Sequence, residues 1–154
     1  AGADGVVLAE PAAGLLSPDI CEEFSSNYIR KIVEETADDT FVFVYHNCGN
    51  TVPLYKTIAS INADIYHFGD AIELEEMLKV FPDDKIVMGN ISPARVIRNL
   101  EPKKIKEEVF SLLNKCSKYE NFLISTGCDI PPLTPLENID AYFSAISEYY
   151  DTDK

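Results

Sequence analysis

The sequence predicts an α/β protein whose core is a parallel β-sheet. Five short apolar segments, each typical of a buried strand, are spread along the 154 residues. Helical patterns fill the intervals, and successive strands begin roughly 20 to 35 residues apart, which is the spacing of βαβ units. Such a series forms a parallel sheet with right-handed crossovers. Two closures fit it: a five-stranded doubly wound sheet, or part of a (β/α)₈ barrel, which needs about 250 residues when complete.

The length and composition are those of one globular domain. Hydrophobic residues make up 46% of the chain and charged residues 25%, and 154 residues are enough for a single core. No apolar run is long enough for a transmembrane helix, so we expect no membrane partner. The net charge of −13 argues against nucleic acid, because Lys and Arg supply most of the affinity for phosphates. The chain begins without Met or signal peptide features, so we expect a processed protein or a piece of a longer one.

Each predicted strand is a short apolar run that is followed by Gly, Pro or a polar turn residue. The predicted strands are residues 6–9, 41–45, 63–68, 85–88 and 121–126. The second has the strongest pattern, because Phe41-Val42-Phe43-Val44-Tyr45 contains only β-branched and aromatic residues. It therefore predicts a strand that is buried on both faces.

Helix signals separate these strands. Ser17-Pro18-Asp19 offers a capping hydroxyl, a proline at the first helical position and an acid in the first turn. Further helices are predicted over 52–61 and 72–80, from Ser92-Pro93 and from Glu101-Pro102, and Thr134-Pro135-Leu136-Glu137 has the capping-box pattern. Three apolar stripes mark the faces expected to pack inward: Ile20, Phe24, Tyr28 and Ile32; Ile105, Val109, Leu112, Leu113 and Cys116; and Ile139, Phe143, Ile146 and Tyr150.

The four cysteines fall into two kinds. Cys116 belongs to a helical stripe and Cys21 lies beside one, so we expect both to be packing residues. Cys48 and Cys128 instead follow the second and fifth strands. An even count is compatible with disulfides in a secreted domain. Nothing in the sequence indicates secretion, so we expect a reducing, cytoplasmic setting with free or metal-bound thiols.

Several polar residues share one position, just after the carboxyl end of a predicted strand. They are Glu10, His46, Cys48, Asp70, Asn90 and Cys128. Parallel folds of both kinds build their active sites at this end of the sheet. Their joint placement therefore predicts a functional site there.

Three of these residues have the chemistry of a metal site. His46 and Cys48 are two apart and point to the same face of a strand, and Cys128 is the third candidate ligand. Zinc accepts nitrogen and sulfur ligands, and three protein ligands leave one position for a substrate. The alternative is a hydrogen-bonded core histidine beside a buried thiol. His67 lies inside the third strand and is expected to pack or to bond a neighbour.

The remaining polar residues allow more than one interpretation. Asp70 is a fourth oxygen ligand, a group that orients a ligand, or a plain loop aspartate. Glu10 faces either the pocket or solvent. Asn90 either binds a substrate or stabilises its own turn. We take Glu10, Asp70 and Asn90 as candidate substrate-binding residues.

The order of the motifs resembles a known family. The segments are Glu10-Pro11 with Gly14-Leu15-Leu16-Ser17-Pro18, His46-Asn47-Cys48-Gly49, Gly89-Asn90-Ile91-Ser92-Pro93, and Gly127-Cys128-Asp129-Ile130-Pro131 with Thr134-Pro135. Together they resemble the C-terminal half of the uroporphyrinogen decarboxylase superfamily over nearly the whole chain. The likeness is strongest to its zinc-dependent, corrinoid-linked methyltransferases of the methylcobamide:coenzyme M type.

This resemblance implies a fold and a ligand set. Residues 1–154 would be one partial domain, holding the last five strands of a (β/α)₈ barrel. In the methyltransferase branch a His-x-Cys pair and a distant Cys hold zinc, and those positions fall on His46, Cys48 and Cys128. Decarboxylases have a histidine in place of Cys128 and need no metal, so the two cysteines favour the methyltransferase branch.

The resemblance also implies a reaction. Zinc would deprotonate a small thiol acceptor, which attacks the methyl group of a methyl-corrinoid carried by a partner corrinoid protein. Asp70 would fill the open zinc position when no thiol is bound. The alternatives are a metal-free, decarboxylase-like enzyme and a non-catalytic zinc-binding domain. Five strands alone leave open sheet edges, so we expect this segment to self-associate and to be inactive without the rest of the barrel.

Overall fold

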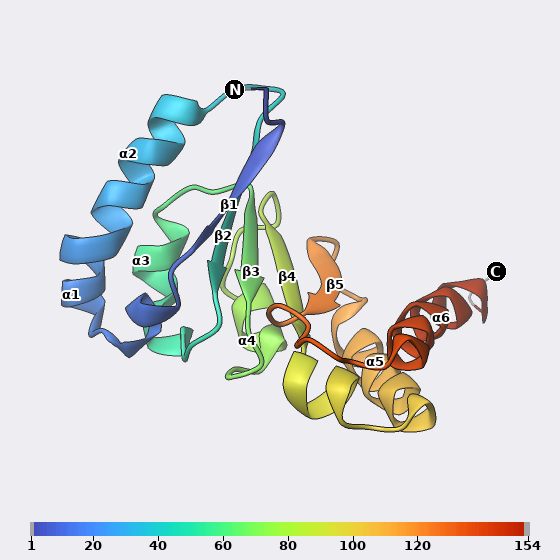
Figure 1. Ribbon diagram of the computed structural model, residues 1–154. Helices are drawn as coiled ribbons and strands as arrows, with labels where there is room; N and C mark the ends of the chain where they lie inside the picture. The colour runs from blue at the N-terminus through green and yellow to red at the C-terminus, as the bar shows by residue number, and fades with distance from the viewer. Residues whose placement is uncertain (1, 153–154) are drawn as a thin grey trace.

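A single five-stranded parallel sheet organises the computed structural model, which describes residues 2–152 (Figure 1). The strands are β1 (Gly5–Ala9), β2 (Val42–Asn47), β3 (Ile65–Phe68), β4 (Ile86–Ile91) and β5 (Phe122–Thr126). They lie side by side in the order β1-β2-β3-β4-β5, with every neighbouring pair parallel. A doubly wound sheet reverses its strand order at a switch point, whereas a barrel keeps it sequential. The order therefore confirms the prediction of the C-terminal five strands of a (β/α)₈ barrel, here as an open sheet.

Helical segments connect the strands. They are η1 (Pro11–Leu15), α1 (Pro18–Cys21), η2 (Glu22–Ser26), α2 (Asn27–Thr36), η3 (Val52–Leu54), α3 (Tyr55–Ala59), α4 (Leu74–Leu78), η4 (Pro93–Arg98), α5 (Pro102–Cys116) and α6 (Leu136–Thr152). Figure 1 shows α1 and α2 beside β1 and β2, and α5 and α6 at the other end of the sheet. In the described part of the chain, no helix combines the length and apolar character that crossing a membrane requires.

The core lies between the helices and one face of the sheet. Large side chains that point to this face are fully buried, among them Tyr45, Tyr66 and Phe68. A second buried cluster joins η4, α5 and α6 through residues such as Ile97, Ile105 and Ala145. The predicted α5 stripe is confirmed, with Leu112 partly buried and the other four residues buried.

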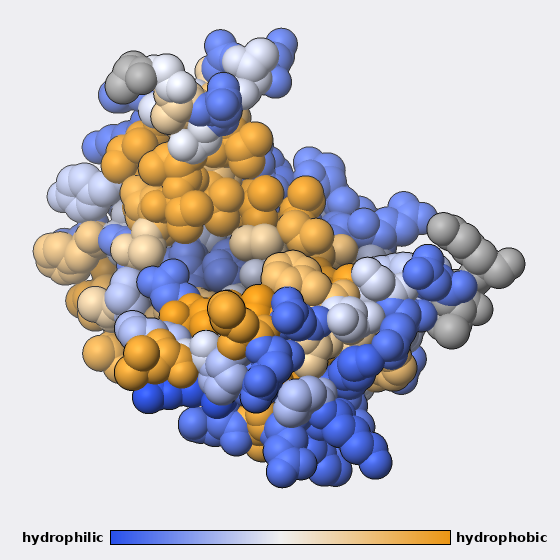
Figure 2. All heavy atoms as spheres, turned by 45° about the vertical axis from the view of Figure 1, so that its right-hand side comes forward, coloured by the Kyte–Doolittle hydropathy of each residue, from blue (hydrophilic) through white to orange (hydrophobic). Residues whose placement is uncertain are grey.

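The opposite face of the sheet is open. Val7 is 62% exposed and Val42 is 43% exposed, and Ile86 and Leu123 are exposed on later strands. Figure 2 shows a broad apolar area on the side of the molecule that it presents. The prediction that the second strand is buried on both faces is therefore wrong for Val42, because residues 2–152 leave 43% of it exposed.

Several predicted element boundaries needed correction. β2 continues for two residues beyond Tyr45, so His46 lies within the strand and not after it. β4 runs to Ile91, which places Asn90 inside that strand. The capping box at residue 134 is wrong, because the Thr134 hydroxyl donates to the Pro131 carbonyl oxygen at 2.7 Å and α6 begins at Leu136.

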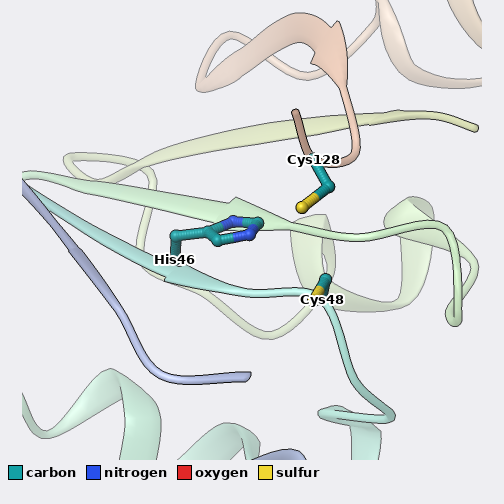
Figure 3. A group of neighbouring side chains, drawn as sticks. All are labelled: His46, Cys48 and Cys128. Atoms are coloured by element: carbon teal, nitrogen blue, oxygen red, sulfur yellow. The ribbon is translucent and has the colours of Figure 1, made fainter. Parts of the chain in front are cut away.

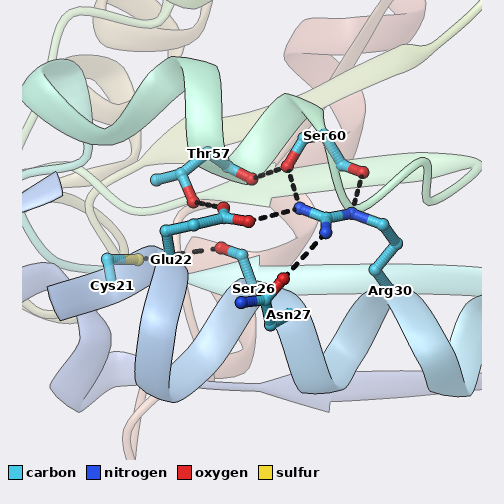
Figure 4. A network of polar contacts seen from close by, with 7 residues as sticks. All are labelled: Cys21, Glu22, Ser26, Asn27, Arg30, Thr57 and Ser60. Atoms are coloured by element: carbon cyan, nitrogen blue, oxygen red, sulfur yellow. Dashed lines mark hydrogen bonds and ion pairs between the residues drawn. The ribbon is translucent and has the colours of Figure 1, made fainter. Parts of the chain in front are cut away.

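The first predicted helical stripe faces solvent. Ile20, Phe24, Tyr28 and Ile32 are 41% to 62% exposed, while the buried positions of this helical segment include Cys21, Ser25, Ser26, Ile29 and Val33. Small side chains let a helix approach its neighbours closely, and polar contacts then hold it there (Figure 4). In those contacts Arg30 pairs with Glu22 at 2.8 Å and donates to the Ser60 carbonyl oxygen at 2.9 Å. The stripe predicted for α6 is also partly exposed, because Phe143 and Tyr150 face solvent.

Candidate metal centre

Three side chains from distant parts of the sequence converge at the carboxyl end of the sheet. His46 comes from β2, Cys48 from the residue that follows it, and Cys128 from the loop after β5 (Figure 3). One ligand atom of each lies within 4.8 Å of the others. His46 is buried, and both thiols are partly exposed. A cation between them would therefore be held by one nitrogen and two sulfur atoms.

Main-chain contacts fix the orientation of His46. Its Nδ1 lies 3.1 Å from the carbonyl oxygen of His67 on the neighbouring strand. A carbonyl oxygen only accepts hydrogen bonds, so Nδ1–H is the donor, and in the neutral tautomer with this proton Nε2 is the atom with a free lone pair. This is the arrangement that metal-binding histidines normally have, because the outer hydrogen bond sets the tautomer.

The turn that carries Cys48 is held on both sides. The Asn47 side chain donates to the Glu10 carbonyl oxygen at 2.7 Å and accepts from the Gly49 N–H at 2.8 Å. Gly69, at the end of β3, lies directly against the turn: a Cβ added there would be 2.5 Å from the Cys48 Cα. Any side chain at position 69 would therefore displace Cys48.

Cys128 is placed by a similarly tight loop. The Gly127 N–H donates to the Ile91 carbonyl oxygen at 2.8 Å, and the Thr126 hydroxyl donates to the Cys128 carbonyl oxygen at 3.0 Å. A Cβ on Gly127 would lie 2.9 Å from the Asp70 backbone nitrogen. The loops after β3 and β5 thus touch backbone to backbone. Sequence reasoning missed this role, although a glycine after each of these strands was its visible signal.

The surroundings of Cys48 favour the protonated form of its thiol when no cation is present. Burial raises the pKa of the Cys48 thiol, and the nearby Cys128 raises it further. Burial also lowers the pKa of His67, which favours a neutral ring beside His46. One imidazole and two thiols form a soft ligand set that suits zinc better than magnesium or calcium.

The other predicted site residues lie outside this group. The Glu10 carboxylate accepts a hydrogen bond from the Ser25 hydroxyl on the helical side. Asn90 donates to the carbonyl oxygens of Gly69 and Ile72, at 3.0 and 2.8 Å, and so supports the loop after β3. Asp70 is exposed and is not part of the group of three ligands. A substrate-binding role for Glu10, Asp70 and Asn90 stays a prediction.

A pocket of about 480 Å³ lies against the three candidate ligands. Its other lining residues are Val7, Ala9, Pro11, His67, Thr126, Asp129 and Ile130. The wall is largely apolar, and the His46, His67, Cys48 and Cys128 side chains contribute imidazole and thiol groups to it. The pocket can therefore admit a small substrate next to a bound cation.

Comparisons with known proteins relate this fold and site to two activities. A sequence model of the family "Uroporphyrinogen decarboxylase (URO-D)" matches residues 1–149. A uroporphyrinogen decarboxylase of Prochlorococcus marinus (strain MIT 9312) is 30% identical over 145 residues, covering 92% of this chain and 40% of that protein. The methylcobamide:CoM methyltransferase MtaA of Methanosarcina barkeri is 32% identical over 153 residues, covering 97% and 43%.

The chain also resembles a solved methyltransferase structure. A methyltransferase from Methanosarcina mazei superimposes with a TM-score of 0.83 at 28% sequence identity, covering 97% of this chain and 43% of that one. The chain thus spans 40% to 43% of the length of the relatives it matches. The matched relatives are enzymes of both kinds, at similar levels of identity.

Proposed function

Because the chain belongs to the uroporphyrinogen decarboxylase family, we propose that it forms part of a zinc-dependent methyltransferase. The proposed reaction moves a methyl group from a methyl-corrinoid to a small thiol. The observation that carries the proposal is the convergence of His46, Cys48 and Cys128 within 4.8 Å. The similarity to a methylcobamide:CoM methyltransferase supports it.

The residues present fit a zinc ion. His46 offers Nε2, because its Nδ1 is engaged with the His67 carbonyl oxygen. Cys48 and Cys128 offer the sulfur atoms of two free, partly exposed thiols. Three protein ligands leave a fourth position, and the adjoining pocket gives a substrate access to it.

The chain's own residues bind, orient and shield in this proposal. Bound zinc supplies one piece of chemistry, the lowering of the pKa of a coordinated substrate thiol to give a thiolate. His46, Cys48 and Cys128 would hold the ion beside the pocket, and apolar lining such as Val7 and Ile130 would limit the hydration of a substrate sulfur there. In the proposed transfer a carbon–sulfur bond would form as the carbon–cobalt bond breaks, and the electron pair of that bond would remain on cobalt. We propose that a corrinoid protein presents the methyl group over the open pocket.

A metal-free decarboxylase is the second candidate, and the 30% identity to a uroporphyrinogen decarboxylase favours it. A metal-free decarboxylation would not require two thiols beside His46. Their joint placement with His46 is the reason to prefer the methyltransferase. The two proposals differ in a simple quantity, the zinc content of the protein.

Metal analysis tests the proposal directly. We expect about one zinc per chain after reconstitution of the wild type, and little zinc in Cys128→Ala. Cys116→Ala is the matched control, because it removes a thiol from the helix layer and should leave zinc content unchanged. Transfer of methyl from methylcobalamin to a thiol by the protein with its complete barrel would then establish the reaction. Absence of zinc from that protein would overturn the proposal in favour of the decarboxylase.

A further inference from the structure

We propose that His67 is a positioning residue that fixes the separation of the two halves of the candidate metal centre. One half is His46 and Cys48, at the end of β2, and the other is Cys128, after β5. By setting that separation, His67 would also set the affinity of the centre for zinc. The affinity statement rests on the proposed function, whereas the positioning statement rests on geometry alone.

His67 contacts the first half through both its backbone and its ring. Its carbonyl oxygen accepts the His46 Nδ1–H at 3.1 Å, which orients the imidazole. The two rings also pack together, with centroids 4.5 Å apart and planes inclined by 36°. His46 and His67 are direct register partners on β2 and β3, so this contact follows from the strand pairing itself.

The His67 side chain reaches the second half across an intervening strand. Its Nε2 lies 2.6 Å from the Thr126 carbonyl oxygen at the end of β5, although β4 separates β3 from β5 in the sheet. Since a carbonyl oxygen accepts, Nε2–H is the donor. Thr126 in turn donates from its hydroxyl to the Cys128 carbonyl oxygen at 3.0 Å.

These contacts form one continuous path between the ligands. It runs from His46 to the His67 carbonyl, from the His67 ring to the Thr126 carbonyl, and from the Thr126 hydroxyl to Cys128. The path crosses the open face of the sheet, where exposed residues such as Val7 and Leu123 show how little other packing is available. Because Nε2 is engaged with Thr126, the ring acts here as a link between strands and not as a ligand.

The first test measures zinc affinity by competition with a chromophoric chelator. His67→Phe keeps a ring but removes the donor, and His67→Gln keeps an amide N–H that can reach the same carbonyl. His67→Phe keeps the backbone carbonyl that orients His46 but loses the ring's hydrogen bond to the Thr126 carbonyl oxygen. We expect it to bind zinc about 10-fold more weakly, at the low end of the effect of losing a group outside the ligand set, and His67→Gln to recover most of that loss. Equal affinities in His67→Phe and wild type would overturn the proposal.

The second test needs no metal. Dibromobimane becomes fluorescent when it alkylates two neighbouring thiols, and mass spectrometry identifies the linked pair. We expect Cys48–Cys128 cross-linking in wild type, a several-fold lower yield in His67→Phe, and recovery in His67→Gln. If wild type fails to bind zinc but cross-linking depends on His67, the proposed function fails and the positioning role stands. If the variants bind zinc and their cross-linking matches wild type, the positioning role fails and the proposed function stands.

A further variant guards against a folding defect. Thr126→Val removes the last link of the path and leaves His67 intact. It should lower both zinc affinity and cross-linking yield in the same direction as His67→Phe. Thermal unfolding of the metal-free proteins identifies any variant that is simply unfolded. A folded Thr126→Val that matches wild type in both measurements would contradict the proposal.

Discussion

Two regions of the molecule hold two cysteines each, and the thiol groups differ in their exposure to solvent. In the helix layer Cys21 and Cys116 are completely buried, and burial raises the pKa of Cys116 to about 11. At the strand ends Cys48 and Cys128 are partly exposed and share a pocket with His46. The same functional group is thus packing material in one region and candidate metal ligand in the other.

The difference comes from the backbone that carries each residue. A thiol on the inner side of a helix packs into the apolar cluster and is fully buried, as Cys116 shows. A thiol just past a strand end is carried into the loop layer, where glycines such as Gly69 and Gly127 bring neighbouring loops into contact. The positions of Cys48 and Cys128 therefore depend on close approach between loops.

The largest expected contrast is in the alkylation rate of the four thiols. In metal-free protein, iodoacetamide should modify Cys48 and Cys128 first, since both are accessible. Cys21 and Cys116 should react at least about a thousandfold more slowly, because modification requires an opening that costs several kcal/mol. Timed mass spectrometry of peptides measures each rate.

Zinc sharpens the same contrast. Added zinc should protect the strand-end pair and leave the slow rates of the helix-layer pair unchanged. Labelling of Cys116 as fast as Cys48 would contradict the burial argument.

The next effect is the pH dependence of zinc binding. The raised pKa of Cys48 means that its thiol is protonated near neutral pH and must lose that proton to bind zinc. Affinity should therefore rise with pH up to that pKa, and fall by about tenfold per unit on acidification from this thiol alone. Chelator competition at several pH values measures the slope. A flat profile between pH 6 and about 8 would show that Cys48 is not a ligand.

A smaller effect separates the two regions by stability. Cys116→Ser places a hydroxyl in the apolar cluster and should lower the free energy of unfolding by about 1 to 3 kcal/mol. Cys128→Ser changes a partly exposed position and should cost about 0.5 kcal/mol or less in metal-free protein. Urea denaturation compares them. Similar losses for both would remove the distinction between packing and ligand thiols.

The smallest effect concerns ion pairs on the helix layer. Hydrogen bonds from Lys118 and Lys79 lower the pKa of Glu75 from 4.5 to about 2. A depressed carboxyl pKa stabilises the fold above pH 4.5, and this contribution is lost as the pH falls toward 2. Glu75→Gln should therefore reduce stability slightly at neutral pH and leave it unaffected near pH 2, by urea denaturation. A variant as stable as wild type at both pH values would show that packing alone holds this layer.

Much of the site was predictable because a parallel sheet has one repeating geometry. His46 and Cys48 share a face through the two-residue period of a strand, and Cys128 meets them because every βα unit ends at the same edge of the sheet. The fold class followed from the alternation of strands and helices. These inferences use only local periods and the order of elements, which a sequence displays directly.

Tertiary structure decided which surfaces meet. The period of Ile20, Phe24, Tyr28 and Ile32 shows that the helix has an apolar face, yet that face is exposed and the side with Cys21 and small serines packs inward. A period carries no information about which neighbour is present to cover a face. The contact of His67 with Thr126 across β4 is of the same kind, since it joins residues 59 positions apart. The sequence by itself determined the elements and the edge where the candidate ligands gather, while only packing in three dimensions decided what covers each face and which contacts link β3 to β5.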